Sequence, residues 1–65
     1  MNPVEIALWY VESHLRDELS LGDVAARAGV SRFHLARAFA AVTGMPVMRY
    51  VRGRRLTEAA QALAA

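Results

Sequence analysis

Apolar residues recur along the whole chain at helical spacing, and no stretch alternates in the manner of a β-strand. The residues at 2–5, Asn-Pro-Val-Glu, combine a cap with a proline suited to the first helical position. They predict a first helix that ends near Asp17, with Glu12 and Arg16 paired on its outer face. The predicted buried stripe of this helix consists of Val4, Leu8, Val11 and Leu15.

Two further helices are predicted to follow in close succession. Ser20 is a helix cap with Asp23 three positions on, and Gly29 is suited to the left-handed conformation that ends a helix. Only one residue separates Gly29 from the next cap, Ser31, so these helices must meet at a steep angle. The third helix is predicted over residues 32–42. Its expected inward residues are Leu35, Ala38, Phe39 and Val42.

A longer fourth helix is predicted after Gly44 and Pro46. Its apolar residues form two strips that are rotated from one another. The first strip contains Val47, Tyr50 and Val51, and the second contains Leu56, Ala59, Ala60 and Leu63. We therefore expect an all-α fold: a helix-turn-helix bundle of three helices over residues 1–45, with the motif at 21–42, and a fourth helix over 46–65.

The composition narrows the classes of function. A chain of 65 residues is one small domain, and the absence of cysteine rules out disulfides and thiolate sites. His14 and His34 are too few for a metal site, so we expect no metal and no cofactor. Without a nucleophile beside a histidine, a phosphate-binding glycine loop or paired buried carboxylates, we expect no enzyme. No apolar run is long enough to span a membrane and no signal peptide is visible, which favours the cytoplasm.

Charge is divided unevenly along the chain. All eight basic residues are arginine. Residues 1–23 carry five acids and one arginine, a net charge of −4, whereas residues 24–55 carry seven arginines and no acid, a net charge of +7. This polarity predicts a polyanion on one side of the molecule, although a coding bias toward arginine would also produce many arginines.

The steep helix pair with a glycine turn predicts a helix-turn-helix, whose second helix enters the major groove of DNA. Arg37 offers a fork for guanine, Phe33 an apolar surface for thymine methyls or sugar, and Ala36 no hydrogen bond. Arg37 as a solvated charge and Phe33 folded back over the second helix remain alternatives. We expect Trp9 to be a partly buried cover of the core. The candidate DNA-binding residues are Ser31, Arg32, Phe33, Ala36, Arg37 and Arg49.

The sequence from residue 11 to residue 63, VESHLRDELSLGDVAARAGVSRFHLARAFAAVTGMPVMRYVRGRRLTEAAQAL, resembles the AraC/XylS family of bacterial transcription regulators. The matching motifs are Leu-Ser-Leu, Ala-x-x-Ala-Gly-Val-Ser, His-Leu-x-Arg-x-Phe, Thr-Gly-x-x-x-x-x-Tyr and Arg-Leu-x-x-Ala. The resemblance implies that the third helix is the recognition helix of the first of two helix-turn-helix units. It places Arg32, Phe33, Ala36 and Arg37 at DNA-facing positions. The family often has a polar residue in place of Ala36, so we expect few bases to be read directly.

The resemblance stops at the end of the linker helix. We therefore expect the chain to be the first part of a longer DNA-binding region, beginning at a true N-terminus and lacking the second unit. The strip of Leu56, Ala59, Ala60 and Leu63 would pack on that unit. In its absence we expect self-association through this strip. There are two alternative interpretations. The chain could be a small helical module that binds an acidic protein partner, or a structural helix pair that binds nothing.

Overall fold

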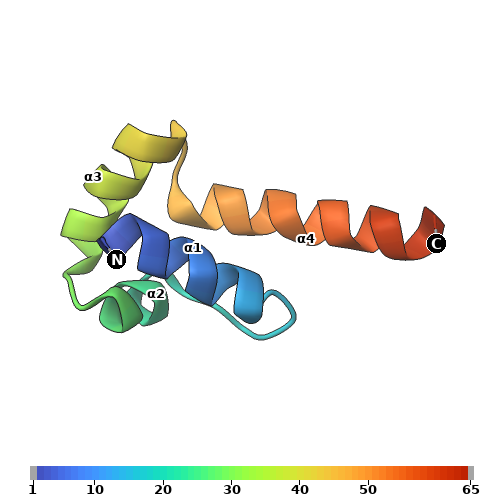
Figure 1. The fold of residues 1–65 in the computed structure, drawn as a ribbon, viewed down its shortest axis with the longest axis horizontal. Helices are drawn as coiled ribbons and strands as arrows, with labels where there is room; N and C mark the ends of the chain where they lie inside the picture. The colour runs from blue at the N-terminus through green and yellow to red at the C-terminus, as the bar shows by residue number, and fades with distance from the viewer. Residues whose placement is uncertain (1, 65) are drawn as a thin grey trace.

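The computed structural model describes residues 2–64, which form four α-helices and no strand. Met1 and Ala65, the outer bounds of the two expected regions, lie outside the described residues. The helices α1, α2 and α3 pack together, and α4 extends away from them (Figure 1). The expected all-α class is confirmed. The bounds are α1 Pro3–Ser13, α2 Leu21–Ala28, α3 Arg32–Thr43 and α4 Val47–Ala64.

Side-chain caps begin the first three helices where the sequence predicts them. The Asn2 side chain accepts a hydrogen bond from the Glu5 backbone N–H at 2.9 Å. Ser20 and Asp23 form a reciprocal capping box, with N···O distances of 3.1 and 3.3 Å. The Ser31 hydroxyl accepts from the N–H of the third helical residue of α3 at 3.0 Å. Each contact pairs a backbone donor that the helix itself leaves unpaired.

Glycine ends α2 and α3, as predicted. Gly29 and Gly44 have φ angles of +75° and +79°, in the left-handed region. After Gly29 the Val30 N–H returns to the Ala25 carbonyl at 3.1 Å, which closes the turn tightly before α3 begins. The short connection produces the steep approach of α2 and α3 that the spacing predicts (Figure 1).

The predicted end of the first helix is wrong by four residues. α1 ends at Ser13 rather than near Asp17. The Ser13 hydroxyl donates to the Trp9 carbonyl at 2.9 Å, and His14 Nδ1 lies 2.9 Å from the Tyr10 carbonyl. These side chains compete for the carbonyl groups of the last turn, so the helix gives way to a turn.

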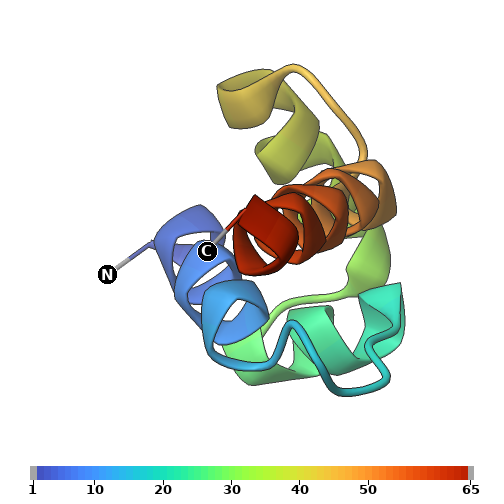
Figure 2. The same ribbon diagram turned by 90° about the vertical axis from the view of Figure 1, so that its right-hand side faces the viewer.

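The core lies where α1, α2, α3 and the start of α4 meet. Phe39 and Leu35 are its largest fully buried side chains, and the Tyr50 ring meets Phe39 edge-on at 5.5 Å. Figure 2 looks along α4, with the other three helices arranged around it. The buried residues are Val4, Ala7, Val11, Val24, Ala25, Ala28, Leu35, Phe39, Val47 and Val51.

Several predictions of burial are wrong or only partly right. Val42 is 69% exposed, because the C-terminal end of α3 extends beyond the helices that cover its earlier turns (Figure 1). Trp9 is 53% exposed, since it lies on the side of α1 opposite Val11. Leu8 and Leu15 are half-buried at the edge of the core.

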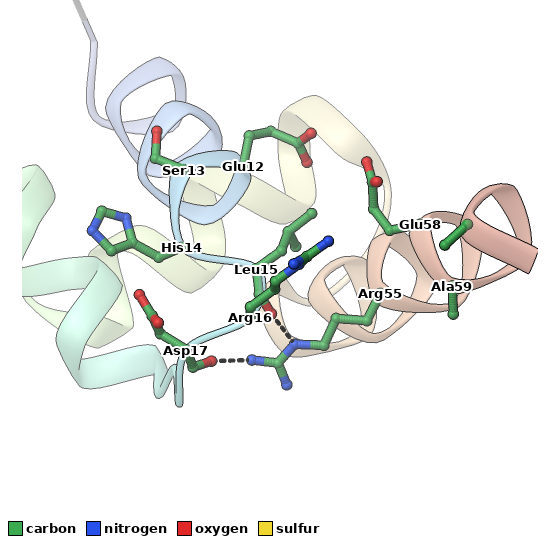
Figure 3. Close-up of a pocket in the computed structure, with 10 residues that line it drawn as sticks. Glu12, Ser13, His14, Leu15, Arg16, Asp17, Arg55, Glu58 and Ala59 are labelled. Carbon is green, nitrogen blue, oxygen red and sulfur yellow. Dashed lines mark hydrogen bonds between the residues drawn. The ribbon is translucent and has the colours of Figure 1, made fainter. Parts of the chain in front are cut away.

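Two arginines of α4 contact the end of α1 and the turn that follows it. Arg54 forms a fork with Glu12, with Nε and Nη2 at 2.8 and 2.9 Å from the two carboxylate oxygens. Arg55 donates to the carbonyls of Leu15 and Asp17 at 2.8 and 2.6 Å, and so joins α4 to the turn that follows α1 (Figure 3). The expected pairing of Glu12 with Arg16 is therefore replaced by a contact that spans 42 positions. These contacts anchor the part of α4 that follows Val51, which is the last residue of this helix buried in the core.

This contact predicts a pH dependence of stability. Hydrogen bonding by Arg54 lowers the pKa of Glu12 below its usual value of 4.5. Burial raises the pKa of Tyr50, whose hydroxyl also donates to Glu12 at 3.4 Å. A carboxylate with a lowered folded-state pKa stabilises the fold above about pH 4.5, and this contribution is lost as the pH falls through the folded-state value.

Glu12→Gln is therefore expected to lower the urea midpoint modestly at pH 7, because both groups are close to solvent. At pH 3 the difference between variant and parent should shrink, since the stabilisation from the ionised Glu12 carboxylate declines below about pH 4.5. Glu18→Gln is the matched control, because Glu18 is exposed and forms no ion pair within residues 2–64. An unchanged difference between pH 7 and pH 3 would contradict the electrostatic account.

Candidate nucleic-acid interface

The outward face of α3 carries an aromatic ring and an arginine. Phe33 is 68% exposed and Arg37 is exposed, whereas Leu35 and Phe39 are fully buried. At 3.6 residues per turn, Phe33 and Arg37 lie on the side of α3 opposite that buried pair. The alternative in which Phe33 folds back into the core is therefore wrong. The structure brings both predicted groups to one accessible surface.

Arg32 lies beside Phe33 at the first turn of α3. Its guanidinium carbon is 5.6 Å from the centroid of the Phe33 ring, which is within the range of a cation–π contact. Both side chains are exposed. The contact keeps a positive charge at the N-terminal end of α3, where backbone N–H groups also favour an anion.

Ser31 is the N-cap of this same turn, and its hydroxyl oxygen is already bonded to the His34 N–H. Ser31 is exposed, so its hydroxyl hydrogen can still be donated to an incoming group. Ser31 and Arg32 thus form the more polar end of the α3 surface, and Phe33 and Arg37 form its middle.

Ala36 and Ala40 complete this surface. Ala36 is half-buried at its edge, and Ala40 is exposed one turn further along α3. Neither side chain forms hydrogen bonds. We name the surface of Ser31, Arg32, Phe33, Ala36, Arg37 and Ala40 the α3 face.

Two of the four arginines of α4 form hydrogen bonds to other segments, and the other two are exposed. Arg54 is bonded to Glu12 of α1 and Arg55 to the turn that follows α1, whereas Arg49 and Arg52 are exposed. Arg49 belongs to a different helix from the α3 face, and in residues 2–64 no hydrogen bond or ion pair joins it to α3. The exposed arginines of residues 24–55 are Arg27, Arg32, Arg37, Arg49 and Arg52.

Arg27 is a residue to which the sequence pattern assigns no specific role. Its guanidinium carbon lies 5.5 Å from the centroid of the Tyr10 ring, so it bridges the last turn of α2 to α1. The arginine-rich character of residues 24–55 was the only signal for it, because the pairing with Tyr10 depends on how α1 and α2 pack. Arg27 therefore adds positive charge on α2 rather than on the α3 face.

In residues 2–64, no three histidine or acidic side chains are close enough together to hold a metal ion. Within that same part of the chain, no helix has the length and apolar character needed to cross a membrane. No charged side chain is among the buried residues of the described structure.

Comparison of the sequence with known proteins identifies the family to which the chain belongs. A family model described as a helix-turn-helix domain matches residues 24–65, which contain most of α2 and all of α3 and α4. Its regulator relatives are of the AraC/XylS type, in agreement with the motifs described above. The chain belongs to this helix-turn-helix family. No solved structure gives a significant match.

Three curated relatives illustrate the similarity. The HTH-type transcriptional activator AarP of Providencia stuartii is 44% identical over 59 residues, covering 91% of this chain and 43% of AarP. The right origin-binding protein of Escherichia coli K12 is 48% identical over 59 residues, covering 91% of this chain and 20% of that protein. The multiple antibiotic resistance protein MarA of Salmonella typhimurium is 43% identical over 54 residues, covering 83% of this chain and 42% of MarA. The chain thus spans less than half the length of each relative.

Proposed function

We propose that the chain binds duplex DNA in a sequence-specific manner, as the first helix-turn-helix unit of an AraC-type bacterial transcription regulator. The observation that carries this proposal is the outward position of Phe33 and Arg37 on the second helix of the motif. The ring and the guanidinium share one accessible face, and the major groove of DNA offers apolar groups to the first and hydrogen-bond acceptors to the second.

Each residue of the site has a proposed role. Arg37 donates two hydrogen bonds to guanine O6 and N7, and Phe33 packs against apolar groups in the major groove. Ser31 and Arg32 contact a phosphate at the N-terminus of α3. Ala36 permits close approach without a hydrogen bond. Arg49 contacts the DNA backbone from the start of α4, because it is exposed and forms no ion pair with any acidic residue of the described part of the chain.

The proposal is tested by a binding selection on random duplexes in the presence of excess unrelated DNA. We expect enrichment of a short motif containing guanine, and an affinity that falls steeply as salt concentration rises. An acidic protein partner would give the same salt dependence, so the enriched sequence is the deciding result. Failure to enrich any sequence, in a chain shown to be helical by circular dichroism, would reject sequence-specific binding.

We further propose that α4 is a linker helix, and that its outer strip associates with a second copy when no other unit covers it. Leu56 is 73% exposed and Leu63 is 90% exposed. They lie two turns apart with Ala59 and Ala60 between them, so two such helices can approach closely. The second unit that the family resemblance implies is the competing partner for this strip.

Sedimentation should therefore show self-association that increases with concentration. Leu63→Glu is expected to shift the chain toward monomer, because a second copy would have to bury the new charge. Thr57→Glu is the matched control, since Thr57 is exposed on another side of α4. A chain that remains monomeric at high concentration, with α4 fully helical, would reject this association.

This function requires the protein to be in the cytoplasm, and at the nucleoid when it is bound to DNA. We propose it on the basis of the regulator relatives.

A further inference from the structure

The α3 face is chemically unusual for a surface proposed to read bases. Between Phe33 and Ala40, Arg37 is the only residue of this face whose side chain can form a hydrogen bond. Phe33 is 68% exposed, Ala40 is exposed and Ala36 borders them. His34 is exposed but lies about 100° around the helix from Phe33, to one side. From Phe33 to Ala40 the face thus presents apolar groups around the guanidinium of Arg37, and Ser31 and Arg32 lie at its N-terminal end.

Apolar groups discriminate among bases in the major groove. Hydrogen-bonding atoms cover most of the base edges there, and the C5-methyl group of thymine is the largest apolar group among them. An alanine methyl or a phenyl ring placed against an amino group or N7 would remove water from it and offer no partner, which is unfavourable. The same side chain against a thymine methyl buries two apolar surfaces together.

The length of the face sets the size of the region that it can read. Phe33 and Ala40 are seven residues apart, which is about 10 Å along a helix. This length corresponds to about three base-pair steps of DNA. Arg37 lies within that interval, so one guanine and the neighbouring thymines can be contacted together.

We propose that the α3 face recognises thymine methyl groups through Phe33, Ala36 and Ala40, around one guanine bound by Arg37. This inference rests on the proposed function and adds the chemical class of the bases. The stacking of Arg32 on Phe33 supports it, because the contact limits the freedom of the ring before DNA arrives.

The test replaces thymine with deoxyuridine, which pairs in the same way but lacks the methyl group. The duplex is the sequence enriched from the random selection, and thymines are replaced one at a time. We expect affinity to fall about threefold to fivefold for each methyl group lost within the α3 contact region. Replacement outside this region should have no effect, which provides an internal control.

A substitution in the protein tests the same idea from the other side. Ala36→Gln places a side chain that pairs with adenine N6 and N7 at the edge of the face, and glutamine is a good helix former. We expect the variant to gain preference for adenine at one position and to lose sensitivity to deoxyuridine there. Ala62→Gln, on exposed α4, is the matched control and should bind as the parent does.

The outcomes separate the two proposals. Equal affinity for thymine and deoxyuridine duplexes, in a chain that still selects a specific sequence, overturns thymine recognition and leaves sequence-specific DNA binding intact. The absence of any selected sequence overturns both. Loss of affinity on deoxyuridine replacement, together with the altered preference of Ala36→Gln, supports both.

Discussion

Arg37→Ala is expected to weaken binding to the selected duplex by about 5-fold to 150-fold, while binding to unrelated DNA changes little. The range is that of one bidentate arginine–guanine contact, about 1–3 kcal/mol. Arg37 is exposed and opposite the buried side of α3, so its removal leaves the core intact. Titrations with the selected duplex and with a scrambled duplex, at one fixed salt concentration, measure the effect.

Arg16→Ala is the matched control for charge. Arg16 is also exposed, but it lies in the turn after α1 and away from the α3 face. It should change the affinity for both duplexes little. An equal loss for Arg37→Ala on the selected and scrambled duplexes would indicate that Arg37 contacts phosphate, and the assignment to guanine would be rejected.

Phe39→Ala is expected to unfold most of the chain at 25 °C. Phe39 is fully buried and its ring meets Tyr50, so truncation opens a cavity at the junction of α3 and α4. Such a substitution costs about 3–5 kcal/mol. A core of this size supplies only about 3–5 kcal/mol of net stability. Loss of the helical circular dichroism signal, with no cooperative thermal transition, is the expected measurement.

Val42→Ala provides the contrast, because it also shortens an apolar side chain of α3. Val42 is 69% exposed, so it leaves no cavity and the melting temperature should stay close to that of the parent. If Val42→Ala destabilised the chain as much as Phe39→Ala, the exposed end of α3 would have to be packed in solution.

The start and end of most helices could be predicted because their signals are local. Ser20 with Asp23, Ser31, and the glycines at 29 and 44 act within one turn of the helix that they begin or end. The candidate residues Phe33 and Arg37 could be assigned to an outward face by helical spacing alone. Their roles toward DNA remain predictions, with the family as their support.

Contacts between distant segments could not be predicted in the same way. Arg54 has Glu58 four residues on, which spacing does predict, and the structure shows this ion pair at 3.0 Å. The stronger fork to Glu12 depends on α4 crossing the end of α1, 42 positions away. No local pattern contains that crossing.

The sequence by itself determined the helix boundaries set by caps and glycines, the turn between α2 and α3, and the face on which Phe33 and Arg37 lie. These follow from hydrogen bonds and backbone angles within a few residues. Only the tertiary structure decided that Val42 and Trp9 are exposed, and which arginines are bonded to α1 and to the turn that follows it. Burial and long-range pairing depend on how the helices pack against one another. Periodicity shows on which side of a helix a side chain lies, but it does not show which other helix lies against that side.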